Sequence, residues 1–301
     1  MTSYSAGGDR DKAFGDASYE MSGHSIGGPD TIYGETGADE LYGDGYYMLD
    51  NSVGGDDLIV GGSGEDLVVG DGHFMRHQSR GGSDTVYGGD EGDRVIGDGY
   101  EMHGSSTGGS DQIYGGAGND ALWGDATSLS DDSVGGNDEL WGGDDYDIIY
   151  GDAALGASTA KGGGDKLHGE GGNDELYGDF AASFGNTHPA GADGHDWLDG
   201  GTGNDILCGG GGNDVFAFGQ FSGVDWIFDF KNSGGEQDMI DVSAYGISSF
   251  NALTINDDTK VHPHDGQPTQ VAIIELSPLD QIIVAGVNAQ DLSAADFIFS
   301  L

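Results

Sequence analysis

A 27-residue repeat dominates the sequence and leaves few architectures open to it. Six blocks with the pattern Gly-Gly-x-Asp-x-aliphatic-x-Gly begin at residues 27, 54, 81, 108, 135 and 162, and a seventh, DGHDWLDG, begins at 193. A fixed period of this length indicates a solenoid, in which each repeat forms one coil that buries its apolar face against its neighbours. Two nonapeptides of each block share the spacing Asp-x-aliphatic-x-Gly and the third lacks it. We therefore predict an 18-residue coil carrying a nine-residue insertion.

Two columns of aliphatic residues predict the core of the solenoid. A three-residue strand needs only one apolar side chain if alternate residues face inward. The columns are Ile32, Ile59, Val86, Ile113, Leu140, Leu167 and Leu198, and then Leu41, Val68, Val95, Leu122, Ile149, Leu176 and Leu207. The insertions have a column of their own, Met21, Met48, Met75, Met102 and Leu129. We expect an all-β fold, a parallel β-roll or β-helix solenoid of about seven 27-residue coils with a C-terminal β-rich cap.

Three columns of aspartates run beside the apolar ones. The first column is Asp30, Asp57, Asp84, Asp111, Asp138, Asp165 and Asp196. The second is Asp39, Asp66, Asp93, Asp120, Asp147, Asp174 and Asp205, with Asp214 expected to continue it. The third is Asp44, Asp71, Asp98, Asp125, Asp152 and Asp179. Stacked coils would hold these like charges about 4.8 Å apart, so the arrangement requires cations.

Glycines at fixed positions before the aspartates indicate which cation is bound. The turns read G-G-x-G-x-D, and glycine lets such a turn direct its carbonyl oxygens inward. The candidate glycines are Gly34, Gly37, Gly61, Gly64, Gly88, Gly115, Gly118, Gly142, Gly169, Gly172, Gly200, Gly203, Gly209 and Gly212. Carboxylate and carbonyl oxygens suit Ca²⁺, whereas Zn²⁺ and Cu²⁺ prefer imidazole or thiolate. We expect roughly ten calcium ions, with altered or weaker sites where Glu91 and Asp145 replace the fourth glycine.

The charge and the cysteine count exclude several classes of protein. A formal net charge of −45 makes nucleic acid and anionic membranes poor partners. The single cysteine, Cys208, cannot form an internal disulfide. No apolar run approaches the length of a membrane span, and no amphipathic helix supports membrane insertion. The N-terminus shows no cleavable signal peptide.

A catalytic motif in the repeat does not indicate an enzyme. Residues 23–27 read Gly-His-Ser-Ile-Gly and match the G-x-S-x-G elbow of serine hydrolases. Ser25 recurs in register as Ser52, Ser79, Ser106 and Ser133, so it is a repeat position rather than a unique nucleophile. The nine histidines form no register either, and no H-E-x-x-H motif is present.

The repeats resemble those of RTX proteins, the hemolysin-type calcium-binding β-roll family exported by type I secretion. The resemblance covers roughly residues 8–218, where G-G-x-G-x-D recurs in register, and residues such as GGEQDMIDVSAYG and AQDLSAADFIFSL resemble the family's C-terminal region. It implies an N-terminal capping segment at 1–26, a calcium-binding roll at 27–218, and a cap with an uncleaved secretion signal at 219–301. It also implies that Asp229, Asp238 and Asp241 bind one further ion.

The resemblance implies a secreted, extracellular protein with no catalytic domain of its own. Its expected partners are calcium ions and the type I exporter, with polysaccharide as a candidate ligand in a surface or matrix role. Two aromatic columns, which we expect to face outward, suggest the sugar: Tyr33, Tyr87, Tyr114 and Trp141, and then Trp123, Tyr150 and Tyr177. Aromatic packing across strands is the favoured explanation of both columns. Two alternatives remain: a non-catalytic module of a polysaccharide-modifying enzyme system, and a membrane-active signalling protein of the nodulation-protein type.

Overall fold

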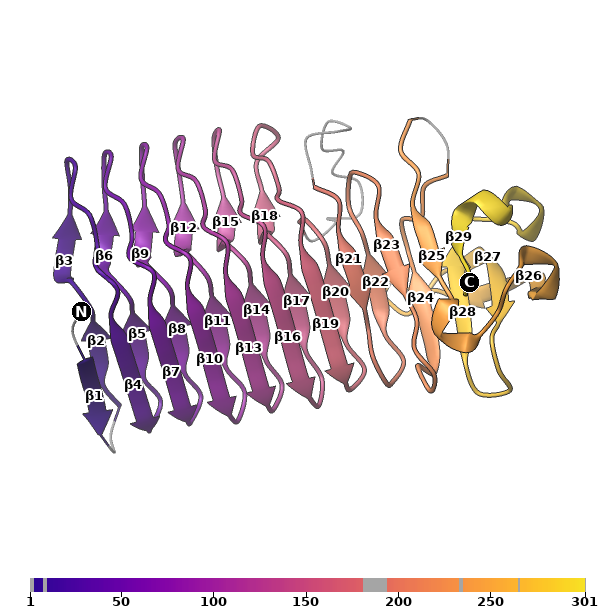
Figure 1. Cartoon of the computed structure of the whole chain (residues 1–301), viewed down its shortest axis with the longest axis horizontal. Helices are drawn as coiled ribbons and strands as arrows, with labels where there is room; N and C mark the ends of the chain where they lie inside the picture. Colours follow the sequence, from indigo (N-terminus) through magenta and orange to yellow (C-terminus); the bar gives the residue numbers. More distant parts are fainter. Residues whose placement is uncertain (1–2, 8–9, 181–193, 233–234, 265, 301) are drawn as a thin grey trace.

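The chain folds into a long stack of parallel coils (Figure 1). The computed structural model describes residues 3–7, 10–180, 194–232, 235–264 and 266–300. Ile32 pairs with Ile59 and Ile59 pairs with Val86, so neighbouring coils are in register at 27 residues. This confirms the predicted all-β parallel solenoid. The predicted start of the seventh block, at residue 193, lies outside the described residues.

Sheet A contains the first strand of each coil, and sheet B contains the second strand. In spatial order sheet A contains β1 (Ser3–Gly7), β4 (Thr31–Thr36), β7 (Leu58–Ser63), β10 (Thr85–Asp90), β13 (Gln112–Ala117), β16 (Glu139–Asp144), β19 (Lys166–Gly171), β21 (Trp197–Asp199), β23 (Val215–Ala217), β25 (Met239–Asp241) and β29 (Phe297–Ile298). Sheet B contains β2 (Lys12–Phe14), β5 (Glu40–Tyr42), β8 (Leu67–Val69), β11 (Arg94–Ile96), β14 (Ala121–Trp123), β17 (Ile148–Tyr150), β20 (Glu175–Tyr177), β22 (Ile206–Cys208), β24 (Val224–Ile227), β28 (Gln281–Ala285), β27 (Pro268–Glu275) and β26 (Thr254–Val261).

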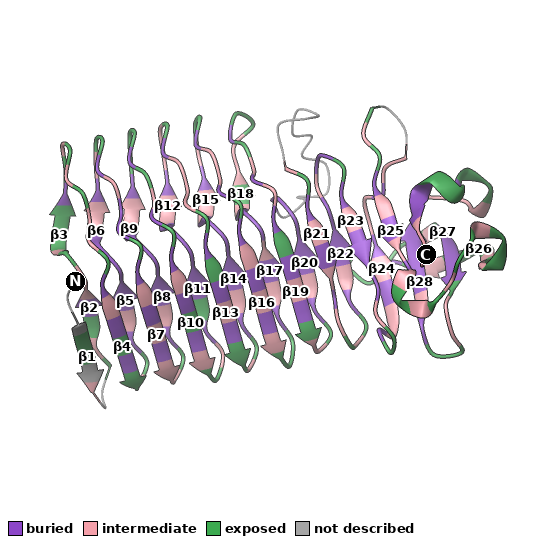
Figure 2. Cartoon of the chain, viewed as in Figure 1, coloured by how far each residue is buried: buried purple, intermediate pink, exposed green. Residues whose placement is uncertain are grey.

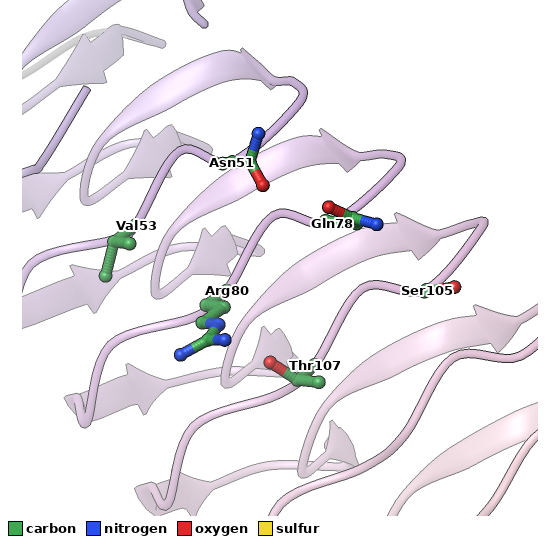
Figure 3. Close-up of a pocket in the computed structure, with 6 residues that line it drawn as sticks. All are labelled: Asn51, Val53, Gln78, Arg80, Ser105 and Thr107. Atoms are coloured by element: carbon green, nitrogen blue, oxygen red, sulfur yellow. The ribbon is translucent and has the colours of Figure 1, made fainter. Parts of the chain in front are cut away.

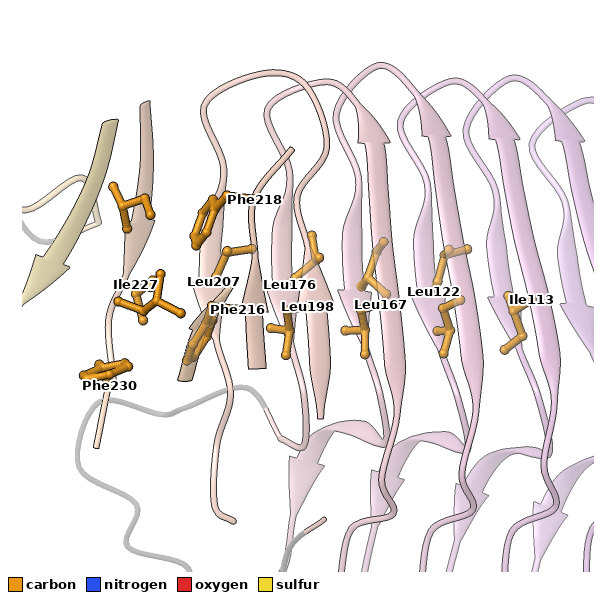
Figure 4. Packing of buried hydrophobic residues seen from close by; sticks show 14 of the residues in the cluster. Ile113, Leu122, Leu167, Leu176, Leu198, Leu207, Phe216, Phe218, Ile227 and Phe230 are labelled. Atoms are coloured by element: carbon orange, nitrogen blue, oxygen red, sulfur yellow. The ribbon is translucent and has the colours of Figure 1, made fainter. Parts of the chain in front are cut away.

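The core lies between sheets A and B and consists of the two predicted aliphatic columns (Figure 4). Ile113 from sheet A and Leu122 from sheet B are both fully buried. The strands of sheet A alternate between buried and accessible residues, as a sheet with one face in the core requires (Figure 2). The core continues beyond the repeats through Phe216, Ile227 and Ile240.

The inserted nonapeptides form a third sheet rather than loops alone. Sheet C contains β18 (Ala153–Gly156), β15 (Ala126–Leu129), β12 (Gly99–Met102), β9 (Gly72–Met75), β6 (Gly45–Met48) and β3 (Ala17–Met21). Each insertion leaves the coil through its sheet C strand and returns through a single bridge residue, such as Val53 paired with Arg80. The predicted column Met21, Met48, Met75, Met102 and Leu129 is buried and forms a second apolar cluster.

Sheets A and B continue past the last G-G-x-G-x-D turn. Strands β24 and β28 pair in parallel, and β28, β27 and β26 then form an antiparallel end to sheet B. The helices of this region are single 3-10 turns, η1 (Ser243–Tyr245), η2 (Phe250–Ala252), η3 (Ala289–Asp291) and η4 (Ala294–Asp296). Among the described residues, no helix has the length and hydropathy needed to cross a membrane.

Candidate metal centres

The second column of aspartates closes the turns that lead from sheet A to sheet B. Asp120 shows the arrangement: its Oδ1 accepts the backbone N–H of Asp93 at 2.7 Å, and its own N–H donates to Asp147 Oδ1 at 2.8 Å. The same bond links every neighbouring pair from Asp39 to Asp205. Each carboxylate is therefore fixed by the coil before it and stacked directly beneath the next.

The other carboxylate oxygen of each of these aspartates is buried without a hydrogen-bond partner among the described residues. This holds for the Oδ2 atoms of Asp39, Asp66, Asp93, Asp120, Asp147, Asp174 and Asp205. A Cβ built on Gly115 would lie 2.5 Å from Asp120 Oδ2 and 2.5 Å from the carbonyl oxygen of Gly142. A carboxylate and a carbonyl from the next coil thus converge on a space that only glycine leaves open. A buried, unpaired carboxylate oxygen is strongly unfavourable unless a cation balances it.

The backbone of a turn changes where glycine is replaced, although φ stays positive. The second and fourth residues of a regular turn, such as Gly62 and Gly64, have φ values of 114° and 128°. Glu91 and Asp145 take the fourth position with φ values of 73° and 77°, in the left-handed region that disfavours side chains. This lower φ is a local change in backbone geometry of the kind expected at these two turns, and each substitution costs of the order of 1 kcal/mol of strain. Glu35, at a second position, behaves likewise with a φ of 71°.

The first and third columns meet on the opposite side of the solenoid, where each insertion leaves and returns. Gly43 and Asp44 precede the insertion and residues 54–57 follow it, and we call these two segments together a split turn. Asp44 Oδ2 accepts the N–H of Gly55 at 2.9 Å, which closes the insertion. Equivalent bonds from a glycine eleven residues later reach Asp71, Asp98, Asp125 and Asp152.

Each split turn brings together the same kinds of oxygen atom as a regular turn, from a carboxylate and a backbone carbonyl, and adds a second carboxylate. A Cβ on Gly43 would lie 1.8 Å from Gly70 O and 2.1 Å from Asp57 Oδ2. The first-column carboxylates also form a ladder, in which Asp57 N–H donates to Asp84 Oδ1 at 2.7 Å. The third column therefore places a carboxylate where half of the motif is missing.

Burial raises the pKa of several of these carboxyl groups far above the usual range. In the second column burial lifts the pKa of Asp120 to about 6 and that of Asp93 to about 8. In the split turns burial, reinforced by the charge of Asp44, raises the pKa of Asp57 to about 8. The pKa of Asp84 lies well above its ordinary value because of burial and the neighbouring charge of Asp57. Without a cation, Asp93 and Asp57, with pKa values of about 8, would largely retain their protons at neutral pH.

The C-terminal aspartates continue both columns. Asp214 Oδ1 accepts the N–H of Asp196 at 3.0 Å, so Asp214 extends the first column. Our expectation that it continues the second column was wrong. Asp225 takes the next place in the second column, where its Oδ1 accepts the N–H of Asp205 at 3.0 Å. Asp238 follows Asp214 in the same way. Asp225 is not among the residues predicted from the sequence, because the short spacing Asp-x-aliphatic at 225–227 occurs there without the glycines of the motif.

The three aspartates implied to bind a further ion, Asp229, Asp238 and Asp241, accept backbone N–H groups. Both oxygens of Asp229 accept backbone N–H groups, from Gly209 and Gly210, and those of Asp238 accept the N–H groups of Asp214 and Lys231. Asp241 Oδ1 accepts the N–H of Ser243. The Lys231 ammonium, which also contacts Glu236 at 3.1 Å, supplies positive charge at this end of the column.

The serines of the G-x-S-x-G register serve the insertions. Ser25, Ser106 and Ser133 each donate through the hydroxyl to the carbonyl oxygen three residues earlier. These bonds close the tips of three insertions, whereas the Ser79 hydroxyl bonds that of Ser106. The return segments border a groove lined by Asn51, Val53, Gln78, Arg80, Ser105 and Thr107 (Figure 3).

The two aromatic columns occupy different environments. On sheet A the rings of Tyr87, Tyr114 and Trp141 stack with centroids about 4.5 Å apart, so mainly their edges face solvent. On sheet B, Trp123 is only 9% exposed and Tyr177 only 8%. The expectation that the second column faces outward was wrong for these two residues.

The donor set fits Ca²⁺. Within the described ranges, no three His, Cys, Asp or Glu side chains gather into one cluster; the oxygens at each turn come from one or two carboxylates and a backbone carbonyl. Hard oxygen ligands of mixed type in a flexible turn are the preference of Ca²⁺, whereas Mg²⁺ demands near-octahedral geometry.

Known proteins share this pattern. A family model for the RTX calcium-binding nonapeptide repeat (4 copies) matches residues 26–45, 53–72, 105–127, 132–154, 159–182 and 190–227. Two solved structures are similar, the AlgE6R3 and AlgE6R2 subunits of the Azotobacter vinelandii mannuronan C5-epimerase. The first is 26% identical, covering 52% of this chain and 79% of that chain with a TM-score of 0.30. The second is 27% identical, covering 48% and 94% with a TM-score of 0.29. No curated protein sequence matches the chain.

Proposed function

Because the chain carries RTX calcium-binding nonapeptide repeats, we propose that it is a secreted, non-catalytic protein whose folding is driven by extracellular calcium. The observation that supports this proposal is the row of buried carboxylate oxygens in the second column, which have no hydrogen-bond partner among the described residues. We assign regular ion sites to the candidate aspartates of the second column and to the first glycine of each turn.

The residues of each turn couple ion binding to folding. Asp120 reaches its neighbours in the adjacent coils only when those coils are stacked, so the unfolded chain offers no comparable site. Bound calcium would supply the positive charge that the aspartate columns lack. If each site has a dissociation constant near 10⁻⁴ M, millimolar calcium stabilises the fold by about 1.4 kcal/mol per site. Roughly ten sites would match the entire stability of a typical domain.

At cytosolic calcium concentrations the same contribution is close to zero, and the net charge of −45 favours an expanded chain. Such a chain suits export through a type I exporter in the unfolded state, with the roll forming outside the cell. We propose that residues 219–301 cap the last coil and carry the uncleaved secretion signal. The antiparallel β26 and β27 support the capping role, since they terminate sheet B.

The experiment is a calcium titration of the purified chain followed by circular dichroism, with bound calcium counted by atomic emission. We expect little β-structure in excess chelator and a cooperative gain on adding calcium. Full β-structure after exhaustive chelation, or a folded chain that retains no calcium, would refute the proposal. Magnesium at the same concentration is the control and should not restore the fold.

A polysaccharide ligand is the second element of the proposal. It is supported by the groove of Figure 3, where the exposed Asn51, Gln78 and Arg80 offer hydrogen-bond donors on successive insertions. The stacked rings of sheet A offer edges rather than faces, so they do not provide a platform for sugar rings. Binding on a glycan array that is lost in the double variant Gln78→Ala and Arg80→Ala would support this ligand, and no glycan binding by the calcium-loaded protein would exclude it.

A further inference from the structure

The two sides of the solenoid differ in how many carboxylates each coil contributes. A regular turn contributes one, such as Asp120, and a split turn contributes two, such as Asp98 and Asp111. We propose that the split turns form a second, tighter class of calcium sites, which fills before the regular turns do. This inference rests on the proposed calcium binding and adds to it an order of filling.

The third-column carboxylates face one another within the split turns. A Cβ on Gly108 would lie 1.8 Å from Asp125 Oδ1 and 2.5 Å from Asp98 Oδ2, so oxygens of consecutive third-column residues converge there. The same convergence recurs at Gly54, Gly81, Gly135 and Gly162.

These carboxylates are completely enclosed. Asp98 and Asp125 have no exposed surface, and Asp125 Oδ2 has no hydrogen-bond partner among the residues that the structure describes. The unpartnered oxygen therefore points into the protein at the place where the carboxylates converge. This is the second observation, beyond the acidic cluster itself, that indicates a ligand.

Charge balance makes the split turns the tighter sites. With one divalent ion per coil, a regular turn carries a net charge of +1, and ions stacked about 4.8 Å apart repel one another. A split turn with two carboxylates per ion is neutral, so this repulsion is absent. One more carboxylate in direct reach of a calcium ion increases its affinity by on the order of tenfold or more.

A purely structural role for the third column makes a different prediction. Asp98 accepts the N–H of Gly109 at 2.8 Å and thereby closes the insertion. An asparagine can accept the same hydrogen bond through its amide oxygen but carries no charge. If the third column only closes insertions, Asp98→Asn leaves calcium binding unchanged and Asp98→Ala alone disturbs the fold.

The test measures the calcium-binding isotherm of the full chain by competition with a chromophoric chelator. The wild type should show two classes of sites separated by about tenfold or more. Asp98→Asn should reduce the number of tight sites, and the matched variant Asp120→Asn, from the regular turn that follows along the chain, should reduce only the weaker class. Circular dichroism at saturating calcium reports whether each variant folds.

If Asp98→Asn does not fold, Asp16→Asn serves in its place. Asp16 lies at the exposed N-terminal end of the third column, where its Oδ2 accepts the N–H of Gly28 at 2.6 Å. A single class of sites in the wild type, or loss of weak sites only in the Asp98 or Asp16 variant, would overturn the inference while leaving calcium binding intact. No calcium uptake by the wild type would instead refute the proposed function.

Discussion

Replacing Asp120 with asparagine should change the calcium dependence of stability by an amount that does not depend on the affinity of the site. Asp120 is 2% exposed, its Oδ1 is held by the N–H of Asp93, and its Oδ2 has no partner among the described residues. Well above the dissociation constant, each ion bound only by the folded state adds about 1.4 kcal/mol to the free energy of unfolding per tenfold rise in calcium. Losing one ion lowers this slope by about 1.4 kcal/mol per decade, and losing two, if Oδ2 bridges neighbouring sites, by about 2.7 kcal/mol.

The assay is urea denaturation followed by circular dichroism across a decade of calcium concentration above the folding midpoint. The control is Asp132→Asn, which removes the same charge from an exposed position on an insertion and should leave the slope unchanged. Asparagine keeps the acceptor for the Asp93 N–H, so the slope separates ion binding from the hydrogen bond. If Asp120→Asn and the wild type give parallel lines, Asp120 is not a calcium ligand and our reading of the turns fails.

Three further predictions concern pH, glycine and the second apolar cluster. Without calcium, the folded-state pKa is about 8 for Asp93 and about 6 for Asp120, and both values exceed the pKa of the unfolded chain. The protonated carboxyl groups therefore stabilise the fold at acidic pH, and this stabilisation is lost as pH rises through 6 to 8. In the presence of chelator, circular dichroism should show the chain gaining β-structure on acidification. Gly124→Ala places a Cβ 1.8 Å from Gly151 O and should lower the free energy of unfolding of the calcium-loaded protein by at least about 1–3 kcal/mol, measured by urea denaturation. Gly219→Ala, whose Cβ has nothing within 4 Å, is the control and should be near neutral. Met102→Ala should cost about 2–5 kcal/mol, and hydrogen exchange should show the loss confined to neighbouring coils.

The repeat made the fold predictable because one register determines both sides of every coil. Once Ile113 and Leu122 are assigned to inward positions, the strand period places Asp111 and Asp120 at the two bends. The sequence therefore located the aspartate columns and the core without any knowledge of the strand pairing, and the structure confirms the solenoid to which they belong.

The parts that the sequence did not predict are those where two segments meet in space without sharing the motif. Asp214 follows a regular G-G-x-G-x-D turn, yet that turn lies on the side of the split turns because no insertion precedes it, and this places Asp214 above Asp196. Asp225 lacks the glycines of the motif, and only its pairing with Asp205 reveals its place. The strand in each insertion was missed because sheet C forms by pairing between insertions, and residues such as Ala126 and Thr127 show no alternating pattern.

Calcium dependence follows from how little else orders a single coil. Each repeat contributes one aliphatic residue to each side of the main core, and most of its other positions are glycine, aspartate or exposed. Glycine loses the most backbone entropy on folding, so the turns oppose folding unless their ligands are satisfied. Fully buried aspartates such as Asp98 oppose it further, since removing a carboxylate from water is unfavourable without a counter-charge. The two features that most destabilise the empty coil, flexible turns and buried charge, are the same two that form an oxygen-lined cation site, and this makes stacking of the coils conditional on the ion.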